Sequence, residues 1–384
     1  MTKDDLMGEF DDVVTDRRLT RAVVEAAVAD TGAVPRPLFG EYLTFASGGS
    51  SGRRGTFVYD LAGVSEWTAR FSRGAVAYLT SRGGPPPGGL SIAVVAASSA
   101  VHLSRFLSAL TETGELPIRY LPVPVTLPVP EIVARLNALQ PAMLAGYPSM
   151  LARLAAEQRA GRLRVAPIMT ISAAETLSRD LRTAIRAGFG VPIIDSFAST
   201  EGLVGASAPD DEVITLCEDG CIVELIDAQG RPARPGTVAA SALITNLTNL
   251  VQPLIRYELT DSFVEQPVTA TGGHRRVRVE GRRDDVFVYD QQPQAVLVHP
   301  LVVRSMLVQV PEIVEYHVQQ TVDGISVTAV TATPVDITAI VERLAGGLRA
   351  AGLTDPDVRV TLASALPRDR RTGKLRRFAP LVSA

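Results

Sequence analysis

Several features that would point to particular classes of protein are scarce or absent in this chain. Its 384 residues include two cysteines, Cys217 and Cys221. These are too few for the disulfide framework of a small secreted domain, which favours a reducing compartment. No apolar run approaches the roughly 18 residues of a transmembrane helix, and the acidic start of the chain lacks the pattern of a secretory signal. The formal net charge of −3 favours neither a nucleic acid nor a membrane as partner. We therefore expect a cytoplasmic protein.

The hydrophobic pattern predicts an α/β protein with a large domain followed by a small one. Hydrophobic residues make up 46% of the chain, which is ample for a large core. From the strand-like segment 90–97 to the segment 191–199, apolar strands alternate with helical segments, as in a parallel sheet flanked by helices. After about residue 212 short strands and turns take over, and the end of the chain reads as a separate small α/β unit.

A loop rich in serine and glycine, SGGSSGRRG at 47–55, lies between two strand-like segments. Such loops direct backbone N–H groups and hydroxyls at phosphate oxygens, and glycine permits a close approach of the backbone. The loop lacks the G-K-[ST] ending of a Walker A motif. By itself it is equally consistent with an ordinary hairpin turn.

Five further segments follow this loop. Each has an ordinary structural interpretation, such as a strand end, a helix start, a surface turn or a basic tail, so their order along the chain carries the argument. They are ISAAE (171–175), DSFASTEG (195–202), PLIRYELTD (253–261), GRRDDVFVYD (281–290) and LPRDRRTGKLRRF (366–378).

In this order the loop and the segments resemble the signature motifs of the adenylate-forming superfamily, in the form found in phenylacetate–CoA ligase-like proteins. The resemblance spans roughly residues 40–378. It implies a large N-terminal adenylating domain, with parallel sheets flanked by helices, and a small mobile C-terminal α+β lid. The region before the phosphate loop is short for the family, which leaves open whether a partner subunit completes the acid pocket.

For the serine–glycine loop, the resemblance implies contacts with the phosphates of ATP. Gly48 stands where the family usually has serine, and Gly55 stands where it has a basic or hydroxyl residue. Arg53 or Arg54 is therefore expected to supply the positive charge. The matching phosphate-binding positions are Ser47, Gly49, Ser50, Ser51 and Gly52.

The second and third motifs imply a site for the adenine base. The backbone around Ala174 and Glu175 would border the base, Phe197 would stack on it, and Ser196 would contact the nucleotide. Phe197 and Ala198 replace the tyrosine and glycine that are usual in the family.

Three residues are expected to line the pocket for the acid: Tyr147, Ala173 and Ala198. Tyr147 is similar to a pocket-wall residue of the family, on a loop that follows a strand. Its alternative interpretation is a half-buried tyrosine of the core, and the sequence does not decide between the two.

The resemblance also implies a magnesium ligand and a ribose ligand. Thr200 would reach a phosphate, and Glu201 would hold Mg²⁺, a hard ion that is usually bound by one or two carboxylates together with substrate phosphates. Asp261 would accept hydrogen bonds from both ribose hydroxyls, as a carboxylate can. Within the same segment Tyr257 also matches the family, whereas residues 258–260 do not.

The last two motifs imply a hinge and a catalytic lysine. Arg282 would lie near the nucleotide and Asp284 would be the pivot, which gives domains of 1–283 and 284–384. Lys374 would enter the active site when the lid closes. Lys3 and Lys374 are the only lysines of the chain, and a compact ammonium differs from a planar guanidinium as a partner for the α-phosphate. A positioned cation stabilises the charge that builds up there.

The implied activity is the ATP-dependent conversion of an aromatic or small cyclic carboxylic acid to an acyl-AMP, for secondary metabolism, followed by transfer to coenzyme A. The usual loop for thioester formation is not recognisable in DQQPQAV (290–296). A carrier-protein thiol, an amine or an inorganic nucleophile is therefore an alternative acceptor. An inactive nucleotide-binding homologue is a second alternative, although such a protein needs neither Lys374 nor Glu201. A homodimer is one of the assemblies left open. A zinc site at Cys217 and Cys221 is disfavoured, because no second ligand pair lies nearby.

Overall fold

The chain divides into two compact units, with the boundary between Val279 and Glu280. The computed structural model describes residues 1–29, 37–46, 55–85, 89–96, 118–267, 273–282, 285–291, 295–298, 300–307, 309–310, 312–368 and 375–381. Among these residues, no helix combines the length and the hydropathy that a membrane crossing requires.

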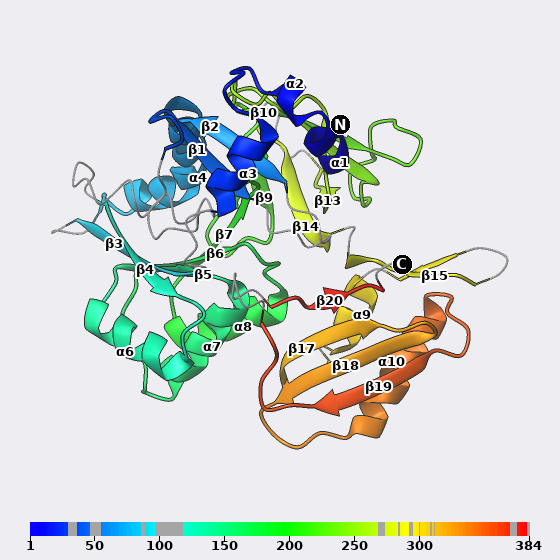
Figure 1. Ribbon diagram of the computed structural model, residues 1–384. Helices are drawn as coiled ribbons and strands as arrows, with labels where there is room; N and C mark the ends of the chain where they lie inside the picture. Colours follow the sequence, from blue (N-terminus) through cyan, green and yellow to red (C-terminus); the bar gives the residue numbers. More distant parts are fainter. Residues whose placement is uncertain are drawn as a thin grey trace. The chain divides into compact units, whose positions relative to one another are not determined.

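A large mixed sheet forms the centre of the first unit (Figure 1). Its described strands follow the order β13-β14-β9-β8-β7-β6-β5-β3-β4. The five strands β7, β6, β5, β3 and β4 run parallel to one another, whereas β8 is antiparallel to both β7 and β9. The α/β class expected from the alternation of strands and helices is confirmed. The strands are β3 (Leu90–Ala96), β4 (Ile118–Pro124), β5 (Met143–Gly146), β6 (Met169–Ala173), β7 (Ile193–Ala198), β8 (Val204–Ser207), β9 (Ile214–Leu216), β13 (Asp261–Glu265) and β14 (Arg276–Arg282).

Helices cover both faces of the parallel part of this sheet. One face is covered by α6 (Val129–Leu139), α7 (Pro148–Arg159) and α8 (Arg179–Phe189), through a core that includes Leu144 and Ile193 (Figure 1). The other face packs against α4 (Leu61–Ser81) through Ile194 and Met169. Successive residues of a strand point to opposite faces, so Ile193 and Ile194 serve the two cores separately.

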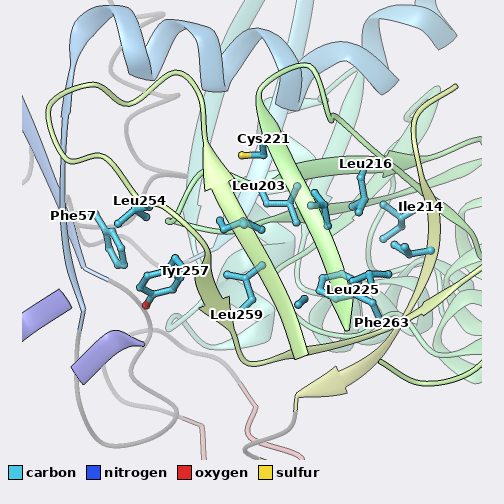
Figure 2. Packing of buried hydrophobic residues seen from close by; sticks show 14 of the residues in the cluster. Phe57, Leu203, Ile214, Leu216, Cys221, Leu225, Leu254, Tyr257, Leu259 and Phe263 are labelled. Carbon is cyan, nitrogen blue, oxygen red and sulfur yellow. The ribbon is translucent and has the colours of Figure 1, made fainter. Parts of the chain in front are cut away.

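The remainder of the first unit is a smaller β structure with its own core. Figure 2 shows this core, in which Phe57, Leu254 and Tyr257 lie close together. Cys217 and Cys221 are free and buried. The elements are the hairpin β1 (Tyr42–Ala46) and β2 (Thr56–Asp60), the sheet of β10 (Cys221–Ile226), β11 (Ser241–Asn246) and β12 (Tyr257–Leu259), and the helices α1 (Lys3–Gly8), α2 (Phe10–Val13) and α3 (Arg21–Ala29).

The second unit is an α+β structure. Its main sheet has the strand order β19-β18-β17-β20, and α9 and α10 pack on it through residues such as Val303, Leu344 and Leu348. A small hairpin, β15 with β16, joins the same core through Phe287 and Tyr289. The elements are β15 (Phe287–Tyr289), β16 (Val296–Val298), α9 (Pro300–Leu307), β17 (Ile313–Gln320), β18 (Gly324–Thr331), α10 (Ile337–Ala350), β19 (Asp357–Leu362) and β20 (Phe378–Ala379).

Candidate nucleotide-binding site

Part of the expected site lies outside the described residues. Arg282 is the last residue of β14, and only its backbone is described. The expected positions outside the described residues are Ser47, Gly49, Ser50, Ser51, Gly52, Arg53, Asp284 and Lys374.

The candidate acid-pocket residues lie at the carboxyl ends of three neighbouring parallel strands. β5, β6 and β7 pair in parallel, with Gly146 opposite Ser172 and Ala173 opposite Ser196. Tyr147 directly follows β5, and Ala173 and Ala198 end β6 and β7. Open α/β sheets bind their ligands at this edge, so the topology brings the three positions to a suitable place.

The chain turns sharply at the end of β6. Ala174 has a φ angle of 68°, in the left-handed region that side chains with a Cβ rarely adopt. The next residue, Glu175, accepts a hydrogen bond through Oε2 from the backbone N–H of Ser149 at 3.3 Å. Ser149 lies in the first turn of α7, where no acidic residue is present and Tyr147 provides no side-chain cap. Glu175 thus places its carboxylate at the positive end of α7.

Beyond β7, the segment with Thr200 and Glu201 packs against the smaller β structure. Phe197 contacts Phe263 edge to face, with ring centroids 5.3 Å apart, and Phe263 belongs to β13, whose first residue is Asp261. The hydroxyl of Tyr59 donates a hydrogen bond to the carbonyl of Thr200 at 2.7 Å. Phe197, the residue expected to stack on adenine, therefore contacts β13, the strand that begins with Asp261, the expected ribose ligand.

Glu201 is held at its backbone and has a buried side chain. Its carboxylate lies close to the phenol of Tyr257. Burial and this carboxylate together raise the pKa of Tyr257, which keeps the phenol protonated. The carbonyl of Glu201 accepts a hydrogen bond from Asn246 Nδ2 at 2.9 Å. Gly202 has a φ angle of 116°, and a Cβ there would lie 2.0 Å from Asn246 Nδ2, so glycine is required.

The donor set around Glu201 fits a magnesium ion that arrives with a nucleotide. Among the described residues, no group of three or more histidine, cysteine, aspartate or glutamate side chains could hold a metal ion. A preformed metal centre needs such a group, whereas Mg²⁺ is often bound by one or two carboxylates and completed by phosphates and water. Glu201 offers one oriented carboxylate of this kind.

The structure also brings together polar residues that the sequence analysis missed. Asp195 lies on β7, where Ser172 Oγ donates a hydrogen bond to its carboxylate at 2.9 Å. Burial raises the pKa of Asp195 to about 6, although Ser172 and Arg182 oppose this. Asn246, Asn249 and Gln252 form a second buried group. The three-residue spacing of amides between mostly apolar residues in the segment 246–252 is the signal that could have revealed them.

Comparisons with known proteins give low sequence identity. No family model matches the chain. It is 24% identical over 159 residues to phenylacetate-coenzyme A ligase of Aromatoleum evansii, covering 40% of this chain and 35% of that protein. It is 24% identical over 218 residues to Protein CapK of Staphylococcus aureus, covering 55% of this chain and 47% of that protein. Each match therefore spans less than half of the relative's length.

The solved structures give a consistent fold. The chain is similar to 2-hydroxyisobutyryl-CoA ligase in complex with R3-HIB-AMP, with a TM-score of 0.66 and 17% identity over 94% of this chain and 78% of that one. For anthranilate CoA ligase with anthranoyl-AMP the TM-score is 0.59, at 16% identity over 86% and 65%. For a benzoate CoA ligase from Burkholderia xenovorans LB400 it is 0.59, at 19% identity over 87% and 67%. The chain has the fold of the adenylate-forming CoA ligases, and the resemblance drawn from the motifs is confirmed at the level of the fold.

Proposed function

We propose that this protein is an AMP-forming acid–thiol ligase, which uses ATP to convert a small carboxylic acid to an acyl-AMP and then transfers the acyl group, with coenzyme A as the first candidate acceptor. The observation that carries the proposal is Glu201, a buried residue whose backbone carbonyl is fixed by Asn246 and whose carboxylate lies close to Tyr257. It follows β7 in a fold shared with ligases that bind acyl-AMP. An aromatic or small cyclic acid is the substrate class we infer, and the cytoplasm is the expected compartment.

In the first step, an oxygen of the acid's carboxylate attacks the α-phosphorus of ATP. The new O–P bond replaces the bond to the bridging oxygen, and pyrophosphate leaves with the electron pair. Negative charge builds up around the α-phosphorus, and we assign its stabilisation to Lys374. Magnesium, when bound, supplies additional positive charge at the phosphates. Glu201 would hold this ion, and Thr200 would contact a phosphate.

The nucleotide is assigned to residues on both sides of the β7 strand end. Phe197 would stack on the adenine, next to the backbone of Ala174 and Glu175, and Asp261 would accept hydrogen bonds from the ribose. The contact between Phe197 and Phe263, close to Asp261 in the chain, supports this pairing of roles. Further nucleotide contacts are assigned to Ser47, Gly49, Ser50, Ser51, Gly52, Arg53, Ser196 and Arg282.

In the second step, we propose that the C-terminal region from residue 284 acts as a lid that turns about Asp284. The acceptor then attacks the acyl carbon, and AMP leaves. Tyr147, Ala173 and Ala198 would contact the acid during both steps. Their position at the ends of adjacent strands supports this assignment.

Acid-dependent exchange of labelled pyrophosphate into ATP tests the proposal directly. The purified chain is incubated with Mg²⁺, ATP and a panel of aryl and small cyclic acids. Exchange with one acid, lost in Glu201→Gln, is the expected result. Product masses with coenzyme A, an amine or a carrier protein then identify the acceptor. If ATP binds and no acid supports exchange, the ligase assignment is wrong and a binding-only homologue takes its place.

A further inference from the structure

Three buried amide side chains occur at three-residue intervals from the last residue of β11 into the segment that leads to β12. Asn246, Asn249 and Gln252 are 6%, 1% and 0% exposed. A buried amide is costly unless its donors and acceptors are satisfied, so the partners of these three side chains show what the segment does. We refer to the three residues as the amide spine.

Asn246 connects the spine to Glu201. Its Nδ2 donates to the carbonyl of Glu201 at 2.9 Å. Its Oδ1 accepts from the backbone N–H groups of Thr248 and Asn249, at 2.9 and 3.0 Å. The hydroxyl of Thr248 donates to the same oxygen at 3.2 Å. These contacts fix the plane of the amide, with Nδ2 directed at the carbonyl of Glu201. The absence of a side chain at Gly202 gives the amide room to reach it.

Asn249 and Gln252 connect the spine to β2. Asn249 Nδ2 donates to the carbonyl of Val58 at 2.9 Å. Gln252 accepts from the N–H of Val58 at 3.1 Å and donates to the carbonyl of Thr56 at 3.3 Å. Thr56 begins β2, the strand that follows the serine–glycine loop in the sequence. The spine thus binds the backbone of this strand and the backbone of Glu201 at the same time.

Two buried tyrosines lie beside this connection. Tyr59, on β2, donates to the carbonyl of Thr200, and Tyr257, on β12, lies close to the carboxylate of Glu201. Tyr257 also packs against Phe57 of β2, with ring centroids 6.3 Å apart (Figure 2). Thr200 is therefore attached to β2 through Tyr59, and Glu201 is attached to the end of β11 through Asn246.

We infer that Asn246 is a positioning residue for Glu201, which sets the direction of the carboxylate that receives the metal–nucleotide complex. The inference rests on the proposed function. Fixing the Glu201 carbonyl restricts rotation of the adjoining peptide, while burial restricts the side chain. An oriented carboxylate binds a metal ion without first losing conformational freedom. Loss of the Asn246 donor removes the restraint on the peptide.

The spine supplies a matched pair of variants. In Asn246→Asp and Asn249→Asp, an oxygen replaces the nitrogen that donates to a carbonyl at 2.9 Å, and the oxygen that accepts two N–H groups remains. Only Asn246→Asp removes a donor to Glu201, since Asn249 donates to Val58. The readout is the binding of α,β-methylene-ATP by calorimetry, without metal and across a Mn²⁺ titration in which free Mn²⁺ is followed by EPR. Melting temperatures are measured in parallel.

We expect Asn246→Asp to raise the Mn²⁺ concentration needed for half-maximal binding by about tenfold, the scale of one lost buried hydrogen bond. Its metal-free affinity should change much less. Asn249→Asp should weaken binding by a similar factor with and without metal, because Val58 follows the phosphate loop. Asn246→Ser, which lacks both the reach of the amide and the added charge, provides the same test if the aspartate variant does not fold.

The outcomes separate the inference from the function on which it rests. If the unmodified chain fails to bind the analogue at any Mn²⁺ concentration, the proposed function is wrong. If it binds, and the Asn246 variants keep its Mn²⁺ dependence or share the response of Asn249→Asp, the positioning role of Asn246 is overturned. A shift of the metal dependence in the Asn246 variants alone supports it, whatever the melting temperatures show.

Discussion

Glu175 and Ser149 join two segments that the motifs place in different parts of the site. The carboxylate of Glu175 accepts a hydrogen bond from the backbone N–H of Ser149 at 3.3 Å. This bond joins the turn after β6 to the first turn of α7. Tyr147, the candidate wall of the acid pocket, is the N-cap residue of the same helix. The segment assigned to adenine thus supports the segment assigned to the acid.

Glu175→Ala should destabilise the chain by about 1 kcal/mol, the usual effect of removing a capping acceptor and a negative charge from a helix N-terminus. Glu175→Gln keeps an acceptor oxygen and should lose less. Urea unfolding of the three proteins measures this order. The KM for the acid should also rise more in Glu175→Ala than in Glu175→Gln. Equal stability of the alanine variant and the parent would show that the contact does not cap α7.

Ala174→Gly should stabilise the chain, although glycine usually weakens it. The φ angle of 68° costs alanine about 1–2 kcal/mol, which exceeds the roughly 0.5–1 kcal/mol that the added flexibility of glycine costs. Ala173→Gly, one residue earlier and within β6, is the matched control and should destabilise. Thermal unfolding of both variants decides the matter, because opposite signs are expected. Two losses of similar size would mean that the turn at Ala174 is not strained.

The parallel core could be predicted from the sequence, because the alternation of strands and helices is a local pattern. The resemblance to the adenylate-forming superfamily could be drawn because the order of the motifs is visible in the chain. The alternation of strands and helices places the ends of β5, β6 and β7 at one edge, and this is where Tyr147, Ala173 and Ala198 lie. The partners of the amide spine could not be predicted in the same way. The spacing of its three amides is visible in the sequence, but Asn249 and Val58 are far apart in it, so local pattern does not show which backbone groups the amides contact.

Asp195→Asn should make the chain more stable at neutral pH. Burial raises the pKa of Asp195 from 3.8 to about 6, so the folded state binds the proton more tightly than the unfolded state. The stability this provides is complete below pH 3.8 and is lost as the pH rises through 6. At 1.36 kcal/mol per pKa unit, asparagine should recover roughly 2–3 kcal/mol at pH 7, because its amide oxygen can still accept from Ser172.

Urea unfolding of Asp195→Asn and the parent from pH 4 to pH 8 tests this linkage. The advantage of the variant should be small at pH 4 and should grow up to about pH 6. Ser172→Ala, which removes the donor that favours the charged carboxylate, should show a steeper loss of stability with rising pH. A parent that remains more stable than Asp195→Asn at pH 8 would mean that the charge interaction with Arg182 outweighs burial.

In the second unit, Arg368 and Glu315 form a buried ion pair at 2.5 Å, with side chains 13% and 9% exposed. Arg368 belongs to the motif that contains Lys374, and Glu315 lies on β17. Removing one partner of a buried pair leaves an uncompensated charge, so Glu315→Gln should destabilise by about 3–5 kcal/mol. The double variant with Arg368→Gln should be less affected than either single variant. Additive losses in this double-mutant cycle would show that the two charges are not coupled.

Lys374→Ala should abolish acyl-AMP formation while leaving ATP binding largely intact. The only other lysine, Lys3, begins α1, so Lys3→Ala is the matched control for the loss of one ammonium. Pyrophosphate exchange should fall by about 100-fold or more in Lys374→Ala, the effect typical of a group that stabilises transition-state charge, and should be unchanged in Lys3→Ala. Lys374→Arg keeps the charge but not the compact shape, so it should recover little activity. Unchanged turnover in Lys374→Ala would remove this lysine from the mechanism, even if the acid-dependent exchange itself is established.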